Sequence, residues 1–174
     1  MKTLEEQLAN YAAYHRDSRN IATHFVGIPM IVVAVATLLS RPAVELAGVT
    51  ASPALIVSAL TALYYLLLDV RLGVLMTALL AGAVSLGAWA AAQSTPVWLA
   101  WGVGGFVVGW VFQFVGHFWE GRKPAFVDDL IGLIIGPLFV TVELLFMLGA
   151  LRGLQQRIEA RVGPVRRGAA TARA

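Results

Sequence analysis

Five apolar segments, separated by short polar connectors, constrain this chain more than any other feature of its sequence. A helix needs ~20 apolar residues to cross a bilayer, and segments of about this length recur along most of the chain. With 59% hydrophobic and 13% charged residues, the chain is far too apolar for a soluble domain of 174 residues. We therefore predict membrane segments at residues 21–39, 54–68, 72–92, 97–118 and 130–150.

The predicted fold is all-α, a polytopic membrane helical bundle with four full spans and a fifth, proline-broken segment, or five spans. Gly136 and Pro137 interrupt the last segment, and a proline there kinks a helix or turns it back as a re-entrant element. Residues 1–151 are expected to form a single membrane-embedded catalytic domain. A basic, partly disordered tail follows at residues 152–174.

An amphipathic helix is predicted before the first span. Four residues fall on one stripe of a 3.6-residue period: Leu4, Leu8, Tyr11 and His15. The polar run at residues 17–20 breaks this helix, and Asn20 is a suitable N-cap for the span that follows. We expect the helix to lie along the membrane surface or to pack under the bundle.

The charged residues indicate orientation in a lipid bilayer and not binding to nucleic acid. The net charge is +3, but most basic residues flank apolar runs or lie in the tail. If the last segment is re-entrant, nearly all of them fall on one face, which the positive-inside rule makes cytoplasmic. We therefore predict an integral membrane protein of the bacterial inner membrane or the endoplasmic reticulum, with both termini cytoplasmic. The chain has no cysteine, so it has no thiol nucleophile or cysteine-zinc site.

A polar stripe marks the end of the fourth segment. Gln113, His117 and Glu120 lie four and three residues apart, which places them on one face of a helix. Gly102, Gly105 and Gly109 continue this stripe backwards and allow another helix to approach closely. An imidazole and a carboxylate one turn apart are able to share a metal ion. The alternative, an interfacial histidine beside a solvated glutamate, stays open at this point.

The other two histidines lie near the start of the first span. His15 and His24 are nine residues apart, which would place them on opposite faces of one continuous helix. A turn at residues 17–20 lets them converge. Counting spans places His15, His24 and His117 at one membrane face, the cytoplasmic one, and favours a shared metal site there. For His24 the alternative is an imidazole bonded to a backbone carbonyl.

Three further charged residues have possible roles near this site. Glu143 is embedded in the last segment, where a carboxylate needs a partner or a proton, and it would support a histidine if Pro137 turns the segment back. Arg122 and Lys123 follow Glu120 and would attract an anionic substrate head group. Their alternative is a plain anchoring role at the cytoplasmic side.

Two blocks of this sequence resemble the 2-hydroxy fatty acid dioxygenase family, small membrane proteins of fungi and bacteria. The resemblance covers roughly residues 10–150, and the middle spans contribute only apolar character. The first block contains Tyr14, His15, Asn20, His24, Gly27 and Pro29. The second contains Gln113, Gly116, His117 and Glu120, followed by Pro124, Ala125, Pro137, Leu138, Phe139 and Glu143.

The resemblance implies Fe(II)-dependent α-oxidation, in which a 2-hydroxy long-chain fatty acid and O2 give the acid one carbon shorter, CO2 and water. Oxygen-activating Fe(II) accepts imidazole and carboxylate ligands and keeps open positions. The residues present that supply this set are His15, His24, His117 and Glu120. The candidate catalytic residues are His117, Glu120, Asn20 and Gln113. The substrate brings its own electrons, so no 2-oxoglutarate or flavin is expected, and the sequence shows no nucleotide-binding fingerprint.

Two other functions remain open from the residues alone. The first is a zinc-dependent membrane lipid hydrolase that uses a bound water, with Glu120 as the base. The second is a small transporter or membrane scaffold, in which Glu143 and the histidines form a proton relay. Against a transporter, the sequence shows no internal repeat of the kind that many transporters contain.

Overall fold

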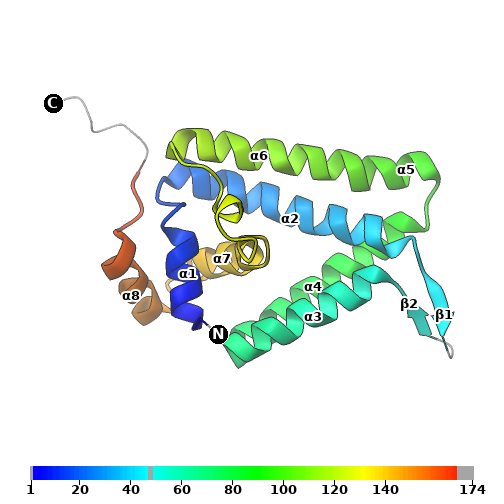
Figure 1. Cartoon of the computed structure of the whole chain (residues 1–174), viewed down its shortest axis with the longest axis horizontal. Coiled ribbons are helices and arrows are strands. Elements are labelled where there is room, and N and C mark those ends of the chain that lie inside the picture. Colours follow the sequence, from blue (N-terminus) through cyan, green and yellow to red (C-terminus); the bar gives the residue numbers. More distant parts are fainter. Residues whose placement is uncertain (1, 47–48, 168–174) are drawn as a thin grey trace. The chain divides into compact units, whose positions relative to one another are not determined.

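The computed structural model describes residues 2–46 and 49–167 as a set of helices with one short hairpin (Figure 1). The α-helices are α1 (Leu4–Ala12), α2 (Ser18–Ser40), α3 (Pro53–Leu68), α4 (Val70–Ala91), α5 (Thr95–Leu99), α6 (Gly105–Glu120), α7 (Gly132–Met147) and α8 (Arg152–Val162). A π-helical turn, Ala100–Gly104, joins α5 to α6, and a 3-10 turn, Ala125–Val127, precedes α7. The strands β1 (Val44–Leu46) and β2 (Val49–Ala51) form an antiparallel hairpin within the predicted connector. The predicted all-α class is confirmed.

The amphipathic N-terminal helix is present as α1. Thr3 caps it, because its hydroxyl accepts from the Glu6 amide while the Glu6 carboxylate accepts from the Thr3 amide. The face that carries Leu8 and Tyr11 is buried. The helix ends at Ala12, earlier than the predicted break at residues 17–20.

The next helix, α2, begins at Ser18, so Asn20 lies in its first turn and is not its N-cap. Asp17 takes the capping position, because its carboxylate accepts from the Arg19 amide at 2.9 Å. The prediction for Asn20 was wrong because α2 starts three residues earlier than expected, directly after Asp17, whose carboxylate caps its first turn.

Among the described residues, three continuous helical segments are long and apolar enough to cross a membrane: α2, α4 and Thr95–Glu120, with 23, 22 and 26 residues. The second predicted segment forms α3, which has 16 residues and is shorter than a typical span. Many large apolar side chains on these helices are exposed, among them Leu60, Leu67, Val74 and Val107. Such surface is expected of a protein whose helices face lipid, and the protein is a membrane protein.

The last apolar segment breaks after Pro137 and not at it. Pro137 lies inside α7, and the helix continues to Met147. The chain then bends by 114° into α8, through Gly149 and Leu151, which both have positive φ. Two nearby residues with left-handed backbone end a helix, whereas a proline inside it removes only one backbone hydrogen bond and lets the helix continue. If α7 and α8 count as one broken span, the described chain has up to four candidate spans.

The first half of the expected tail is helical. Residues 152–162 form α8, whose Arg157 and Arg161 both contact the Glu5 carboxylate of α1. Residues 168–174 lie outside the described residues. Disorder there stays a prediction.

Two compact units make up the chain: Met1–Ile28 with Val111–Ala174, and Pro29–Trp110. We call them the terminal unit and the middle unit. The terminal unit contains α8 as well as α1 and α7, so its limits differ from those of the domain predicted over residues 1–151, which stays a prediction. All the candidate site residues belong to the terminal unit.

In the middle unit, glycines allow close helix packing. A Cβ on Gly102 would overlap the side chain of Leu38, and one on Gly87 would lie 2.8 Å from the backbone of Ala36. Gly105 faces the Ala34 Cβ at 3.4 Å. The predicted close approach along the glycine stripe is therefore confirmed at Gly102 and Gly105.

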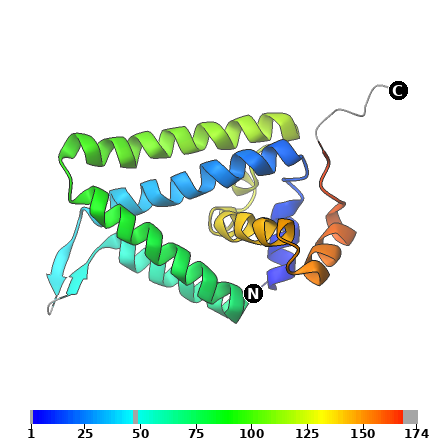
Figure 2. The ribbon, with the colours of Figure 1, turned by 180° about the vertical axis from the view of Figure 1, so that it is seen from behind.

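In the terminal unit, α1 lies beside α7 and α8, as both views show (Figures 1 and 2). Gly116 of α6 permits contact with α2, since a Cβ there would overlap the Thr23 hydroxyl and the Asn20 amide oxygen. Gly136 of α7 similarly leaves room for the Tyr11 ring, whose hydroxyl lies 3.0 Å from the position of a Cβ. These contacts bring the N-terminal residues against α6 and α7.

Candidate metal centre

The first histidine of the site is carried by an irregular segment. Residues 13–17, between α1 and α2, form a turn that we call the histidine loop. His15 lies in it and is fully buried. Its Nδ1 donates to the Tyr11 carbonyl at 2.7 Å, and its ring stacks on the Tyr11 ring with centroids 4.2 Å apart. These contacts hold the ring while its Nε2 lies 3.0 Å from the Nε2 of His24.

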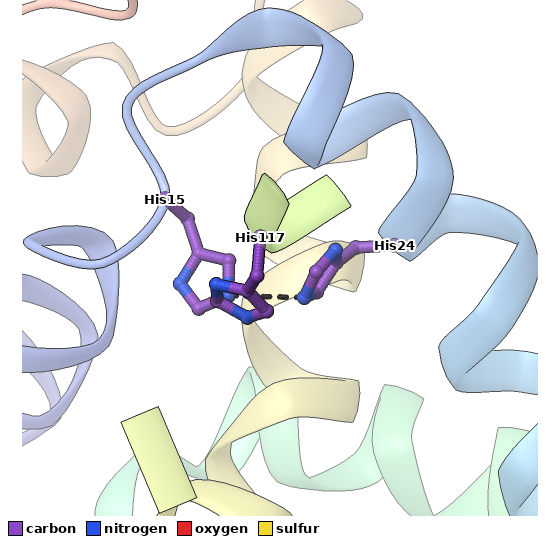
Figure 3. Close-up of side chains that lie close together, drawn as sticks. All are labelled: His15, His24 and His117. Carbon is purple, nitrogen blue, oxygen red and sulfur yellow. Dashed lines mark hydrogen bonds between the residues drawn. The ribbon is translucent and has the colours of Figure 1, made fainter. Parts of the chain in front are cut away.

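The other two histidines come from long helices. His24, on the second turn of α2, is fully buried, and its Nδ1 donates to the Asn20 carbonyl at 2.8 Å. His117 lies one turn before the end of α6. Its ring centroid is 4.9 Å from that of His15 and 5.1 Å from that of His24. The three rings turn toward one another, as Figure 3 shows.

The three imidazoles form a set that fits a metal ion. One nitrogen of each lies within 4.8 Å of the other two, and the Nε2 atoms of His15 and His24 are 3.0 Å apart. Nitrogens bound to one divalent ion at ~2.1 Å lie roughly 3 Å apart when they subtend a right angle at it. The separation of His15 and His24 therefore suits neighbouring ligands of one ion.

The tautomers support the same conclusion. A carbonyl oxygen only accepts, so Nδ1 of both His15 and His24 carries the proton. In the neutral rings both Nε2 atoms are then unprotonated, and two lone pairs 3.0 Å apart repel unless a cation or proton lies between them. Burial, with the neighbouring His24 and His117 rings, lowers the pKa of His15 well below its usual range, which disfavours an added proton. A metal cation resolves the conflict, and carbonyl-bound Nδ1 atoms are typical of metal-ligating histidines.

Glu120 does not belong to this group of ligand atoms. Its side chain is buried, and its two oxygens accept several N–H groups. Oε2 accepts from the backbone amides of Arg16 and Asp17, at 2.9 and 2.7 Å, and from Asn20 Nδ2 at 3.1 Å. Oε1 accepts from Arg166 Nη2 at 2.7 Å. The structure thus uses the carboxylate predicted as a ligand to hold the histidine loop.

Asn20 and Gln113, both predicted as catalytic, are buried near the histidines along the chain. Asn20 bridges the Tyr14 carbonyl and Glu120 through its Nδ2, whereas its Oδ1 has no partner in the described part of the chain. Gln113 lies one turn before His117, and its Nε2 likewise has no acceptor among the described residues. Buried amide atoms without partners are costly, which makes both groups available to a ligand.

Glu143 partners an arginine and not a histidine. Its Oε1 lies 3.4 Å from Arg16 Nη2, and both side chains are buried. Arg16, next to His15 in the chain, brings a guanidinium to this carboxylate, and the predicted support of a histidine by Glu143 stays a prediction. The remaining Arg16 donors bond to the carbonyls of Ala12, His15 and Gly163.

The two predicted head-group residues have different surroundings. Lys123 forms an exposed ion pair with Asp128, which also accepts from the Tyr14 hydroxyl. Arg122 donates to the Ala13 carbonyl and lines a cavity of about 600 Å³. The other arginines of this cavity are Arg16, Arg161 and Arg166, and Glu120 also lines it. Arg122 is therefore the better placed of the two to meet an anion.

Sequence reasoning missed three residues that support the site. Tyr11 was placed on the buried stripe of α1, and its i, i+4 spacing to His15 was the signal for the stacked ring and the carbonyl bond. Arg16 and Arg166 gave no signal, because a basic residue in a polar turn or tail looks solvated in the sequence.

Together, the fold and the site define a helical membrane protein with a buried three-histidine set suited to a metal ion. Comparison with known proteins identifies the family. The model of the Mpo1-like family, described as "2-hydroxy-palmitic acid dioxygenase Mpo1-like", matches residues 1–148, and the chain belongs to this family. It is 34% identical over 161 residues to the 2-hydroxy-palmitic acid dioxygenase MPO1 of Saccharomyces cerevisiae, covering 90% of this chain and 87% of that protein. No solved structure matches the chain.

Proposed function

We propose that this protein is an Fe(II)-dependent dioxygenase that oxidises a 2-hydroxy long-chain fatty acid to the acid one carbon shorter. The observation that carries the proposal is the convergence of His15, His24 and His117, with two unprotonated Nε2 atoms 3.0 Å apart. The family description and the name of the yeast relative support the reaction class. The proposed metal ligands are these three histidines.

Iron is favoured over zinc by the reaction class. Three imidazoles bind either metal, but zinc has no redox chemistry, whereas Fe(II) with histidine ligands and open positions supplies oxygen activation when bound. Three neutral ligands leave the dipositive charge of the ion uncompensated. That charge favours an anionic substrate, and the carboxylate of a 2-hydroxy acid provides the anion.

The chain's own residues orient the substrate in this proposal. Gln113 Nε2 and Asn20 Oδ1, which lack partners among the described residues, are a donor and an acceptor for the carboxylate and hydroxyl of the substrate. Arg122, beside the cavity, would attract the carboxylate toward the site. The three histidines are themselves shielded from solvent, so a substrate bound beside them would be largely shielded from bulk water.

The net reaction balances without another cofactor. One 2-hydroxy acid and one O2 give the shortened acid, CO2 and water, and the bond between the carboxyl carbon and the hydroxylated carbon breaks. The substrate supplies all the electrons that O2 accepts. We place the site at the cytoplasmic face of a bacterial inner membrane or an endoplasmic reticulum membrane, where the hydrocarbon tail stays in the lipid.

The structure favours neither of the other functions considered from the sequence. In a zinc hydrolase Glu120 would act as a base, but its oxygens already accept four N–H groups. In a proton relay Glu143 would exchange protons with a histidine, but it pairs with Arg16. Both residues are occupied by fixed donors.

The test is incubation of anaerobically purified protein with 2-hydroxypalmitic acid, Fe(II) and ¹⁸O-labelled O2, followed by mass spectrometry. We expect the fifteen-carbon acid with incorporated label, and none when Zn(II) replaces Fe(II). Palmitic acid, which lacks the hydroxyl, is the matched control and should stay unchanged. Absence of oxygen consumption with loaded protein and the hydroxy acid would refute the proposal.

A further inference from the structure

The segment after α8 folds back and contacts the histidine loop. Gly163, with φ of 82°, ends α8, and residues 163–167 follow in an extended path that we call the C-terminal strap. The family model ends at residue 148, so the strap lies outside the matched residues. Its conformation places Arg166 beside Asp17 in a parallel β-bridge.

The backbone of the strap holds the histidine loop on both sides of Asp17. Arg166 N donates to the Arg16 carbonyl at 2.6 Å, and Ser18 N donates to the Arg166 carbonyl at 2.9 Å. Arg16 Nη1 also donates to the Gly163 carbonyl at 3.0 Å. Two main-chain bonds and one side-chain bond thus join the strap to Arg16 and Ser18, which lie one and three residues after His15.

The Arg166 side chain adds a link to α6. Its guanidinium, largely exposed, donates to Glu120 Oε1 at 2.7 Å, and the Glu120 side chain is only 1% exposed. The other oxygen of Glu120 accepts from the amides of Arg16 and Asp17. Glu120 therefore connects three elements: the strap, the histidine loop, and the helix that carries His117 one turn earlier.

The histidine loop needs such external bonds. An irregular segment makes few hydrogen bonds of its own, and fixing each residue costs about 1–2 kcal/mol of conformational entropy. His15 must nonetheless stay where its Nε2 meets His24, or one of the three ligands is lost. The bonds from the Arg16 and Asp17 amides to Glu120, together with the pairing of Asp17 with Arg166, restrict the loop at the two residues that follow His15.

We propose that the C-terminal strap is a functional part of the metal centre, in which Arg166 and Glu120 are positioning residues for His15. Neither touches the ion. They act by fixing the histidine loop against α6. The role as part of a metal centre rests on the proposed function, whereas the restraint on the loop does not.

The test compares Arg166→Ala, a chain that stops after Val162, and Arg167→Ala, using full-length protein in detergent as the reference. Arg167→Ala removes the same charge from the neighbouring position and is the matched control. Hydrogen exchange at the Asp17 and Ser18 amides measures the loop without metal. Co(II) titration measures affinity, and the visible spectrum of bound Co(II) reports ligand geometry.

We expect faster exchange at both amides, an altered Co(II) spectrum and a ~10- to 100-fold loss of affinity in Arg166→Ala, the usual effect of losing support behind a ligand. The shortened chain should show a larger loss. Arg166→Lys should restore part of the affinity, because it keeps a cation at Glu120. Arg167→Ala should match the reference.

Unchanged exchange, spectrum and affinity in both Arg166→Ala and the shortened chain would overturn the proposal. If the shortened chain does not fold, the Arg166→Ala variant alone tests the proposal, since it keeps the backbone pairing between residues 17 and 166. A reference protein that binds no metal would refute the proposed function and the positioning role together. Faster exchange in Arg166→Ala would then establish the restraint on the loop alone.

Discussion

The Nε2 atoms of His15 and His24 lie 3.0 Å apart, and the Nδ1 atom of each ring donates to the carbonyl four residues earlier. The same local bond thus fixes both tautomers, although one ring belongs to a loop and the other to a helix. The pair meets His117 from α6, so the three rings come from three separate elements. This arrangement is compatible with a metal ion.

Replacing any one of the three histidines by Ala is expected to lower bound Fe(II) by more than the 10- to 100-fold typical of a supporting residue. In the proposed centre each ring is one of three ligands, so its loss removes a bond to the ion and not only a support. Metal content after anaerobic dialysis, measured beside thermal unfolding in detergent, checks this. Tyr65→Phe, a change of a buried ring in the middle unit, is the control and should retain the metal. Full occupancy by Fe(II) in all three histidine variants would refute the proposed metal centre.

Gly116→Ala is expected to destabilise the protein by about 1–3 kcal/mol and to weaken metal binding. The added methyl would overlap the Thr23 hydroxyl and the Asn20 amide, forcing apart the helices that carry His24 and His117. Gly104→Ala is the matched control, because nothing lies within 4 Å of its Cβ position. Equal unfolding temperatures for the two variants would show that α2 and α6 tolerate the methyl.

Glu143→Ala is expected to cost about 3–5 kcal/mol, since it leaves the buried Arg16 guanidinium without its carboxylate. Glu143→Gln should cost less, because the amide oxygen still accepts. The double variant Arg16→Met with Glu143→Leu should recover most of the loss, as apolar replacements of buried ion pairs often do. Chemical unfolding in detergent measures all three. If Glu143→Ala unfolds with the same free energy as the wild type, the Arg16–Glu143 ion pair does not contribute to stability.

Reporter fusions at Met1 and Ala174 are expected to lie on the same side of the membrane, the cytoplasmic one. The Glu5 carboxylate of α1 contacts Arg157 and Arg161 of α8, which brings the N-terminal and C-terminal helices together. A reporter inserted between β1 and β2 should lie on the opposite side. Fusions at the two termini on opposite sides would contradict both the contact and our use of the charge rule.

Periodicity was enough to predict the helices near the site, because it depends on local geometry alone. The stripe through Leu8 and Tyr11 and the spacing of Gln113 and His117 both match the structure, since 3.6 residues per turn holds in any environment. The exact ends of the helices were harder to predict from the sequence. The turn lies at residues 13–17 and not at 17–20, because Asp17 caps α2 before Asn20 can.

The roles of the charged residues were not predictable in the same way. Glu120 has the spacing of a metal ligand and also that of an acceptor for the loop amides, and only the position of Arg16 and Asp17 distinguishes the two. Likewise, Glu143 was within reach of a histidine if its helix folded back at Pro137. Because α7 continues through the proline, the carboxylate meets Arg16.

The sequence alone determined that the protein is a helical membrane protein, that its histidines lie near the ends of apolar segments, and which family it resembles. These properties follow from hydrophobicity, local spacing and short motifs, each of which is contained within a few turns of chain. Only the tertiary structure decided that His15 meets His24, that Glu120 holds the histidine loop, and that Arg166, 46 residues after Glu120 in the chain, bonds to that carboxylate. Such contacts depend on how helices pack, and close packing is set by shape at residues such as Gly116 and Gly136, which hydropathy does not record.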